Sequence, residues 1–275
     1  MRRIARARIS ARTTLQWHRE MYVALTRAVP PSFVHCELTH VERAPIDVRI
    51  ATEQHARYED TLRSLGCRVE RIAATPELPD SIFVEDAAVV FDEIAVITRP
   101  GAESRRSEIE TVAAALAPHR RLHSIDAPGT IDGGDVLQIG RRVYVGISQR
   151  TNAEGVRQLA DALGPYGYTV TGLAVERCLH LKSAVTVAAD DLLVLNPAWI
   201  DGERFEGSKW IDVHPDEPFA ANVVRVGDTV ICAEGAPRTR DRLERAGLRV
   251  VTTPTSELAK AEGALTCCSL IFAER

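Results

Sequence analysis

The chain has 275 residues, a length that suits one large domain or two small ones. Apolar residues make up 45% and charged residues 26%, near the globular average, which excludes a wholly disordered or collagen-like chain. No stretch approaches the ~20 consecutive apolar residues that a membrane span needs, so we expect a soluble protein without a membrane partner.

The net charge of −4 is distributed unevenly, because the first 20 residues are strongly basic. They hold six arginines against one acid, Glu20, and so carry +5, which leaves −9 for the remainder. An acidic remainder argues against nucleic acid as the main partner, since phosphate binding needs a basic surface. The leader resembles an organellar transit peptide or an extension ahead of a natural start at Met21. We expect residues 1–20 to lie outside the fold and residues 21–275 to form a single catalytic domain.

The six cysteines are not spaced as a metal site or a redox motif, because no Cys-x-x-Cys pair occurs. An even number of cysteines also suits a disulfide framework, but such frameworks belong to short secreted chains. We therefore expect reduced thiols in a cytoplasmic protein, and one of them is a candidate nucleophile.

A repeat runs through the chain. Each copy has a polar residue, a short apolar strand, a tight turn and a second strand. The polar anchors are Asp86, Asp135, Lys182, Asn222 and Cys267, at spacings of 49, 47, 40 and 45 residues. The last copy is a half-unit, whose missing strand residues 21–30 could supply. These spacings predict a radial array of five repeats, in which the two ends of the chain pair to complete the last repeat.

Helical periodicity adds a helix to most of the repeats. Apolar residues recur at three- and four-residue spacings in 50–65, 105–116, 151–163 and 238–246, with Asn152 as a candidate cap of the third. A further strand follows at 67–74, 168–173 and 248–252. The sequence therefore predicts an α/β fold, a five-bladed αβ propeller of ββαβ repeats. Because such an array brings the same end of every unit to one axis, the polar anchors should surround a central site.

Chemically competent side chains occur in three apolar segments that we expect to be strands: 80–86, 179–182 and 263–269. Each has an ordinary structural explanation when taken alone. The acids of the first could be solvated at a strand end, and a lone histidine or cysteine is usually a core residue. In the third segment strand alternation would turn only one of Cys267 and Cys268 toward the axis.

A fourth segment pairs Asp132 and Asp135 across two glycines, which permit positive φ or a close approach of backbone to a ligand. Alone, this pattern suits a turn. Together the four segments offer a thiol nucleophile, a histidine acid/base and several carboxylates that attract a cation. A bound cation would also favour the thiolate form of Cys267.

Six motifs resemble one enzyme family as a set and in order. They are Phe-Val-Glu-Asp (83–86), Ile-Thr-Arg-Pro-Gly-Ala-Glu-Ser-Arg-Arg (97–106), Asp-Gly-Gly-Asp (132–135), Arg-Thr-Asn-Ala-Glu-Gly (150–155), Leu-His-Leu-Lys (179–182) and Leu-Thr-Cys-Cys-Ser (265–269). Across about residues 21–273 the chain resembles the dimethylarginine dimethylaminohydrolases, of the guanidino-group-modifying superfamily. The resemblance implies a five-fold pseudosymmetric αβ propeller. It also implies hydrolysis of Nω-methylated arginines to citrulline and methylamines, with no metal or cofactor.

The resemblance also implies residue roles. Cys267 would attack the guanidinium carbon, His180 would protonate the leaving amine and then activate water, and Asp132 would orient His180. The implied substrate contacts are Glu85 and Asp86 around the guanidinium, Arg99 and Arg150 on the α-carboxylate, Asp80 on the α-amine, and the backbone carbonyls of Val29 and Ala261. Val29 replaces a usual leucine and Glu262 a usual aspartate, and both changes bear on substrate size and methylation preference.

Three alternatives stay open. An arginine deiminase would use the same cysteine chemistry on unmethylated arginine, although deiminases are typically longer and carry a helical insertion. A catalytically inactive propeller would only bind an arginine-like ligand or a protein partner. A metallohydrolase would use His180, Asp132 and Asp135, a set whose single histidine suits zinc poorly. We expect an enzyme with a small-molecule guanidino substrate, and the sequence leaves open whether it is a monomer or a homodimer.

Overall fold

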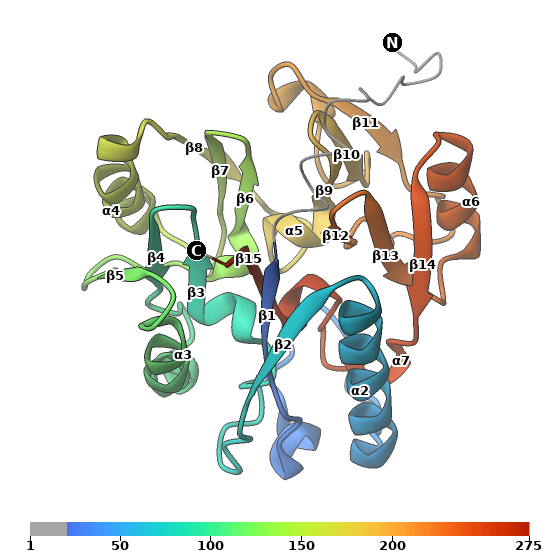
Figure 1. Ribbon diagram of the computed structural model, residues 1–275, viewed down its shortest axis with the longest axis horizontal. Helices are drawn as coiled ribbons and strands as arrows, with labels where there is room; N and C mark the ends of the chain where they lie inside the picture. The colour runs from blue at the N-terminus through green and yellow to red at the C-terminus, as the bar shows by residue number, and fades with distance from the viewer. Residues whose placement is uncertain (1–20, 275) are drawn as a thin grey trace.

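The computed structural model describes residues 21–274, which form five three-stranded sheets arranged as a ring (Figure 1). In every sheet two strands pair antiparallel, and a third strand lies parallel to the middle one. This is the predicted ββαβ unit, and the prediction of a five-bladed αβ propeller is confirmed. The predicted leader, 1–20, lies outside the described residues.

The strands follow the ring in chain order. The five sheets contain β1 (Tyr22–Arg27), β2 (Cys67–Ile72) and β15 (Leu270–Ala273); β3 (Ala88–Val90), β4 (Ile94–Ile97) and β5 (Arg121–Ser124); β6 (Val136–Ile139), β7 (Arg142–Ile147) and β8 (Thr169–Ala174); β9 (Val185–Ala189), β10 (Leu192–Leu195) and β11 (Lys209–Asp212); and β12 (Val224–Val226), β13 (Thr229–Ala233) and β14 (Arg249–Thr253).

The ends of the described chain close the ring, as predicted from the half-repeat. Strand β15 pairs antiparallel with β1, so that Tyr22 faces Ala273 and Leu25 faces Leu270. A blade shared by both ends has to form from residues about 250 positions apart. Its hydrogen bonds therefore hold the whole ring together.

The predicted helices lie on the outside of four blades (Figure 1). They are α2 (Val48–Ser64), α3 (Ile109–Leu116), α4 (Ala153–Leu163) and α6 (Pro237–Arg245). The Asn152 side chain accepts a hydrogen bond from Gly155 N at 2.8 Å, which confirms it as the cap of α4. The fourth blade differs from the predicted repeat, because only one 3₁₀ turn, η6 (Gly202–Arg204), occupies the crossover before β11.

Short helical turns precede four of the five inner strands. They are η2 (Val84–Ala87) before β3, η4 (Gly133–Asp135) before β6, α5 (Leu181–Ala184) before β9 and η7 (Thr266–Cys268) before β15. The remaining short elements are η1 (Pro31–His35), η3 (Glu103–Glu108), η5 (Gly164–Tyr166) and α7 (Ser256–Ala259). The turns bring the predicted anchors of the repeats to the same end of the ring. Among residues 21–274, no helix has the length and apolarity to cross a bilayer.

Candidate active site

The three segments expected as strands are helical turns instead. Asp86 lies in η2, His180 is the N-cap of α5, and Cys267 lies in η7; the strands begin only after these turns. A short apolar run has the same composition in a buried turn as in a buried strand, so periodicity could not separate the two. The turns matter because they allow neighbouring residues to face different cavities.

A small pocket collects most of the predicted site residues. The cavity holds about 20 Å³, the room of roughly one water molecule. Its lining comes from the turns η2, η3 and η7, from the N-cap of α5 and from connecting loops. The lining residues are Glu37, Asp80, Phe83, Asp86, Arg105, Arg150, Leu179, His180, Ala261, Glu262, Gly263 and Cys267.

His180 lies between two buried carboxylates. Its Nε2 atom is 3.1 Å from Oδ2 of Asp132, and its Nδ1 atom is 3.8 Å from Oδ1 of Asp86. Burial by itself would lower the pKa of His180, but attraction to Asp86 and the hydrogen bond to Asp132 raise it to about 9. The imidazole is therefore protonated at neutral pH and can act as an acid.

Asp132 is held in place from its other side. Its Oδ1 atom accepts a hydrogen bond from Gly101 N at 2.9 Å, and its backbone N–H donates to Thr151 Oγ1 at 3.1 Å. The side chain is fully buried. With its remaining oxygen on His180, Asp132 fixes the orientation of the imidazole ring.

Asp86 is ionised. Burial would raise its pKa, but His180, the Arg105 guanidinium at 2.6 Å and the Gly134 N–H at 3.0 Å lower it to about 2. The pocket thus contains a fixed negative charge at neutral pH, which favours a cationic ligand.

The two adjacent cysteines have different environments. Cys267 lines the pocket and is partly buried, whereas Cys268 is fully buried and its Sγ donates to Ala264 O. Burial raises the pKa of Cys267, and the nearby Glu85 and Asp86 carboxylates raise it further. In the unliganded pocket Cys267 is therefore a neutral thiol. A cation placed beside it would oppose the effect of the carboxylates.

The arginine deiminase family model matches residues 68–220. The chain is 40% identical over 252 residues to the N(G),N(G)-dimethylarginine dimethylaminohydrolase of Streptomyces coelicolor, covering 91% of this chain and 97% of that relative. The chain belongs to the dimethylarginine dimethylaminohydrolase family.

A solved structure of the family enzyme from Pseudomonas aeruginosa, complexed with citrulline, has the same fold. It matches with a TM-score of 0.88 at 34% identity, covering 92% of this chain and 100% of that one. The sequence comparison with the Pseudomonas aeruginosa enzyme gives 36% identity over 228 residues, 82% of this chain and 90% of the relative. The resemblance drawn from the motifs is thereby confirmed.

Two predicted substrate contacts lie outside the catalytic pocket of this family member. Arg99 forms a β-bridge with Ile131 and donates from its guanidinium to Gly129 O at 3.3 Å. Val29 packs against a hydrophobic core cluster. Neither residue is among those that line the pocket. The contacts of Arg99 with the α-carboxylate and of the Val29 carbonyl with the α-amine stay predictions, since the predicted role of Val29 uses its backbone and not the side chain that packs in the core.

The pocket contains Arg105 and Glu37 instead, and the sequence reasoning missed both. Arg105 comes six residues after Arg99 in the same motif, where η3 turns its side chain inward. No pattern in the sequence marks Arg105 as buried, because it stands in the polar run Glu103–Glu108. Glu37 lies in the loop that follows η1, and no periodic pattern marks it.

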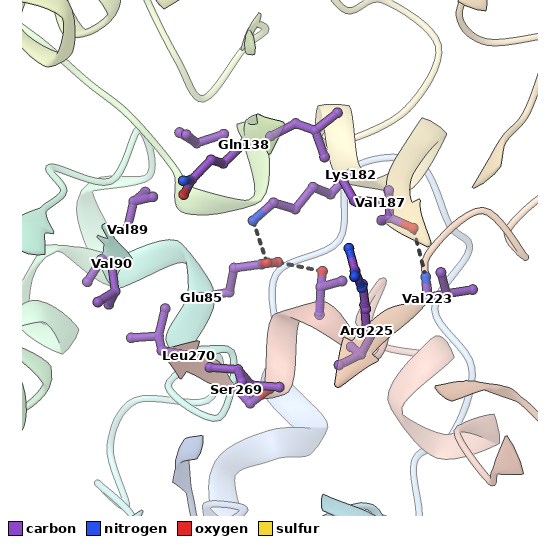
Figure 2. Close-up of a pocket in the computed structure, with 17 residues that line it drawn as sticks. Glu85, Val89, Val90, Gln138, Lys182, Val187, Val223, Arg225, Ser269 and Leu270 are labelled. Atoms are coloured by element: carbon purple, nitrogen blue, oxygen red, sulfur yellow. Dashed lines mark hydrogen bonds and ion pairs between the residues drawn. The ribbon is translucent and has the colours of Figure 1, made fainter. Parts of the chain in front are cut away.

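Glu85 does not line the catalytic pocket, and its predicted contact with the guanidinium stays a prediction. It lines a separate cavity of about 280 Å³ on the propeller axis, bounded by the five inner strands (Figure 2). Figure 2 shows Glu85 pointing toward Lys182, whose Nζ is 2.6 Å from Oε1 of Glu85. The other oxygen, Oε2, accepts from Thr266 Oγ1 at 2.7 Å. Consecutive acids of η2 thus serve two cavities.

The glycines of the Asp132–Asp135 motif serve close packing. Neither Gly133 nor Gly134 has positive φ, but a Cβ on Gly133 would lie 1.9 Å from Glu85 O, and one on Gly134 2.6 Å from His180 Nδ1. Asp135 is turned away, with its oxygens accepting from Leu181 N, Ser148 and Thr151.

The metallohydrolase alternative therefore loses one of its three residues. The described residues that could surround an ion are Asp86, Asp132 and His180, within 4.8 Å of one another. Asp86 in this group is already ion-paired with Arg105. The group supplies one histidine and two carboxylates that already have an ion-pair or hydrogen-bond partner. This arrangement suits a hydrogen-bonded imidazole better than a zinc centre.

Proposed function

We propose that this protein hydrolyses Nω-methylated arginines to citrulline and a methylamine. The observation that carries the proposal is the pocket in which Cys267, His180 and the ionised Asp86 meet, in a chain that belongs to the dimethylarginine dimethylaminohydrolase family. The citrulline complex of the Pseudomonas aeruginosa relative supports the same ligand class. The substrate is a small cationic guanidino compound.

Substrate binding activates the nucleophile in this proposal. The guanidinium cation pairs with Asp86 and lowers the pKa of Cys267, which carboxylates and burial keep high in the free pocket. Because His180 is already protonated, it cannot take the thiol proton. That proton leaves to solvent as the substrate enters.

The first chemical step forms a bond between Sγ of Cys267 and the guanidinium carbon. The bond from that carbon to the methylated nitrogen breaks, and His180 donates its proton to the departing amine. The products of this step are a cationic thiouronium on Cys267, a neutral methylamine and a neutral His180. Asp132 keeps the imidazole oriented throughout.

Water completes the cycle. Neutral His180 accepts one proton as water attacks the thiouronium carbon, a second proton goes to solvent, and the carbon–sulfur bond breaks. Citrulline leaves, and Cys267 returns as the thiolate. The balance requires no redox partner and no group beyond the residues of the pocket and one water.

At the far end of the substrate, Arg150 and Arg105 line the pocket near Asp80. We assign the α-carboxylate to Arg150 and the α-amine to Asp80, with the backbone of Ala261 beside it. Burial raises the pKa of Asp80, although Arg105 offsets part of this effect, so an incoming ammonium would also stabilise its ionised form.

The test is citrulline release from asymmetric dimethylarginine, monomethylarginine and arginine, with the Cys267→Ser variant alongside. We expect release from the methylated substrates and a loss of activity of at least about 10⁴-fold in Cys267→Ser. The match to the arginine deiminase family model makes plain arginine the competing substrate. A higher kcat/KM for arginine than for both methylated compounds would replace the proposal with a deiminase. Folded wild-type protein that released citrulline from none of the three would refute both.

A further inference from the structure

The pocket is closed by a loop, residues 36–43, that is anchored on both sides. The Glu37 N–H donates to Asp80 Oδ2 at 3.1 Å. The Thr39 N–H donates to Glu262 Oε2 at 2.7 Å, and the His40 N–H donates to Oε1 of the same carboxylate. Backbone amides thus tie the loop to two acids of the pocket.

The Glu37 side chain reaches into the end of the pocket assigned to the amino-acid head group. Its Oε2 atom is 3.5 Å from an Arg150 guanidinium nitrogen, and its Oε1 accepts from Ser104 Oγ. The same nitrogen of Arg150 donates to Thr39 Oγ1 at 3.3 Å. The Arg150 side chain is only 13% exposed, so its charge is largely enclosed by these partners.

Arg105, the other arginine of the pocket, has different partners. It pairs with Asp86 and Glu108 and donates to Asp80 O and Phe83 O. Its partners are buried, whereas Glu37 is 39% exposed on a loop. Arg150 is therefore the arginine of this pocket whose carboxylate partner can be exchanged.

The size of the pocket favours exchange. A space of about 20 Å³ holds one water molecule and is too small by itself for an arginine derivative. A larger cavity of about 560 Å³ shares Leu179, Glu262 and Gly263 with the pocket, so movement of the 36–43 loop would join the two spaces. The Glu37 carboxylate is already paired with the Arg150 guanidinium, to which the substrate carboxylate would bind.

We propose that Glu37 is a specificity-determining residue: an internal carboxylate that fills the head-group position on Arg150 until the carboxylate of the substrate displaces it. The proposal rests on the proposed function of the pocket. Displacement frees the 36–43 loop from Arg150 and opens the space that the cavity lacks. A ligand without a carboxylate cannot replace Glu37 as the ion-pair partner of Arg150, so Glu37 stays in place.

The expected size of the effect follows from competition. A ligand that binds only after a partly exposed ion pair opens has its affinity reduced by the fraction of open molecules. Exposed and partly exposed pairs are worth a factor of about two to five. Removing the Glu37 charge should therefore lower the KM for methylarginine and the Kd for citrulline by about two- to fivefold, with kcat nearly unchanged.

The experiment compares Glu37→Gln with wild type, with Glu42→Gln as the matched control. Glu42 is an exposed acid on the same loop, so its variant makes the same change in net charge. Ser104→Ala is a second variant, because it removes the hydroxyl that holds Oε1 of Glu37. Citrulline binding is measured by calorimetry alongside steady-state turnover. Agmatine, which has the guanidinium without the carboxylate, serves as the second ligand.

The expected result is tighter citrulline binding and lower KM in Glu37→Gln, a smaller change in the same direction in Ser104→Ala, and wild-type values in Glu42→Gln. Agmatine should bind wild type at least fivefold more weakly than citrulline, and Glu37→Gln should widen that ratio, because the variant tightens the binding of citrulline and not that of agmatine. Unchanged or weaker citrulline binding in Glu37→Gln, with turnover intact, would overturn this inference and leave the proposed function standing. Wild-type protein that neither binds citrulline nor releases it from any substrate would refute both this inference and the proposed function.

Discussion

Lys182 Nζ lies 2.6 Å from Oε1 of Glu85, and both residues line the axial cavity rather than the catalytic pocket. Lys182 also donates to Gly133 O at 3.1 Å, which ties α5 to η4. Both side chains face the axis, whereas Asp86, the next residue after Glu85, faces the catalytic pocket. The pair therefore joins three blades at the point where the site is built.

Lys182→Met should destabilise the protein by about 2 kcal/mol, because it leaves the nearly buried Glu85 carboxylate without its cation. The value lies below the range for a fully buried pair, since the Lys182 side chain is 18% exposed. Urea denaturation measures the change. The control is the double variant Glu85→Gln with Lys182→Met, which removes both charges and should recover part of the loss. Equal midpoints for the single variant and wild type would show that the pair contributes nothing to stability.

Much of the architecture was predictable, because periodicity reports packing directly. The 40- to 49-residue repeat and the helical spacing gave the five blades, and the half-repeat gave the pairing of β1 with β15. The helical periodicity gave no helix for the connection before β11, and the structure has only a 3₁₀ turn, η6, there.

The site was less accessible to sequence reasoning, because side-chain direction depends on turns that have no periodicity. Arg99 and Arg105 share one motif, and only the β-bridge at Arg99 and the 3₁₀ turn at Arg105 decide which one faces the pocket. Glu85 and Asp86 likewise diverge because η2 is a 3₁₀ turn. The residue types indicated the chemistry of the site, but the directions of their side chains could be learned only from the structure.

Asp132→Asn should reduce citrulline release by about 10²-fold or more, with the loss larger at pH 8 than at pH 6.5. The carboxylate of Asp132 helps raise the pKa of His180 to about 9, so the variant lowers that pKa. A larger fraction of His180 then loses its proton at pH 8 than at pH 6.5. A pH–rate profile of kcat measures the effect. Asp135→Asn provides a graded comparison: that carboxylate also raises the pKa of His180 through its charge, but it bonds Leu181 N rather than the imidazole, so the loss should be smaller. A parallel loss at every pH would contradict the role assigned to Asp132.

Glu262→Ala should loosen the 36–43 loop without unfolding the protein. Glu262 adopts φ of +54°, a strained conformation for a residue with a side chain, and its carboxylate accepts from two loop amides. Hydrogen exchange at the Thr39 and His40 amides should accelerate at least about tenfold when this acceptor is lost. Glu262→Gln keeps one acceptor oxygen and should show a smaller change. Exchange at wild-type rates in Glu262→Ala would mean that the loop is held by other contacts.

Gly133→Ala should destabilise the protein by about 3 kcal/mol or more, because a Cβ at this position would lie 1.9 Å from Glu85 O and could be relieved only by moving backbone. Gly235 is the matched control: it is exposed, its φ is not positive, and a Cβ there meets nothing within 4 Å. Gly235→Ala should leave stability within about 1 kcal/mol of wild type, or raise it by restricting the unfolded chain. Urea midpoints of the two variants separate a requirement for close packing between η4 and η2 from a general effect of replacing glycine. Equal midpoints would show that η2 can yield, and the backbone contact between these two blades would then not be what holds Asp86 beside His180.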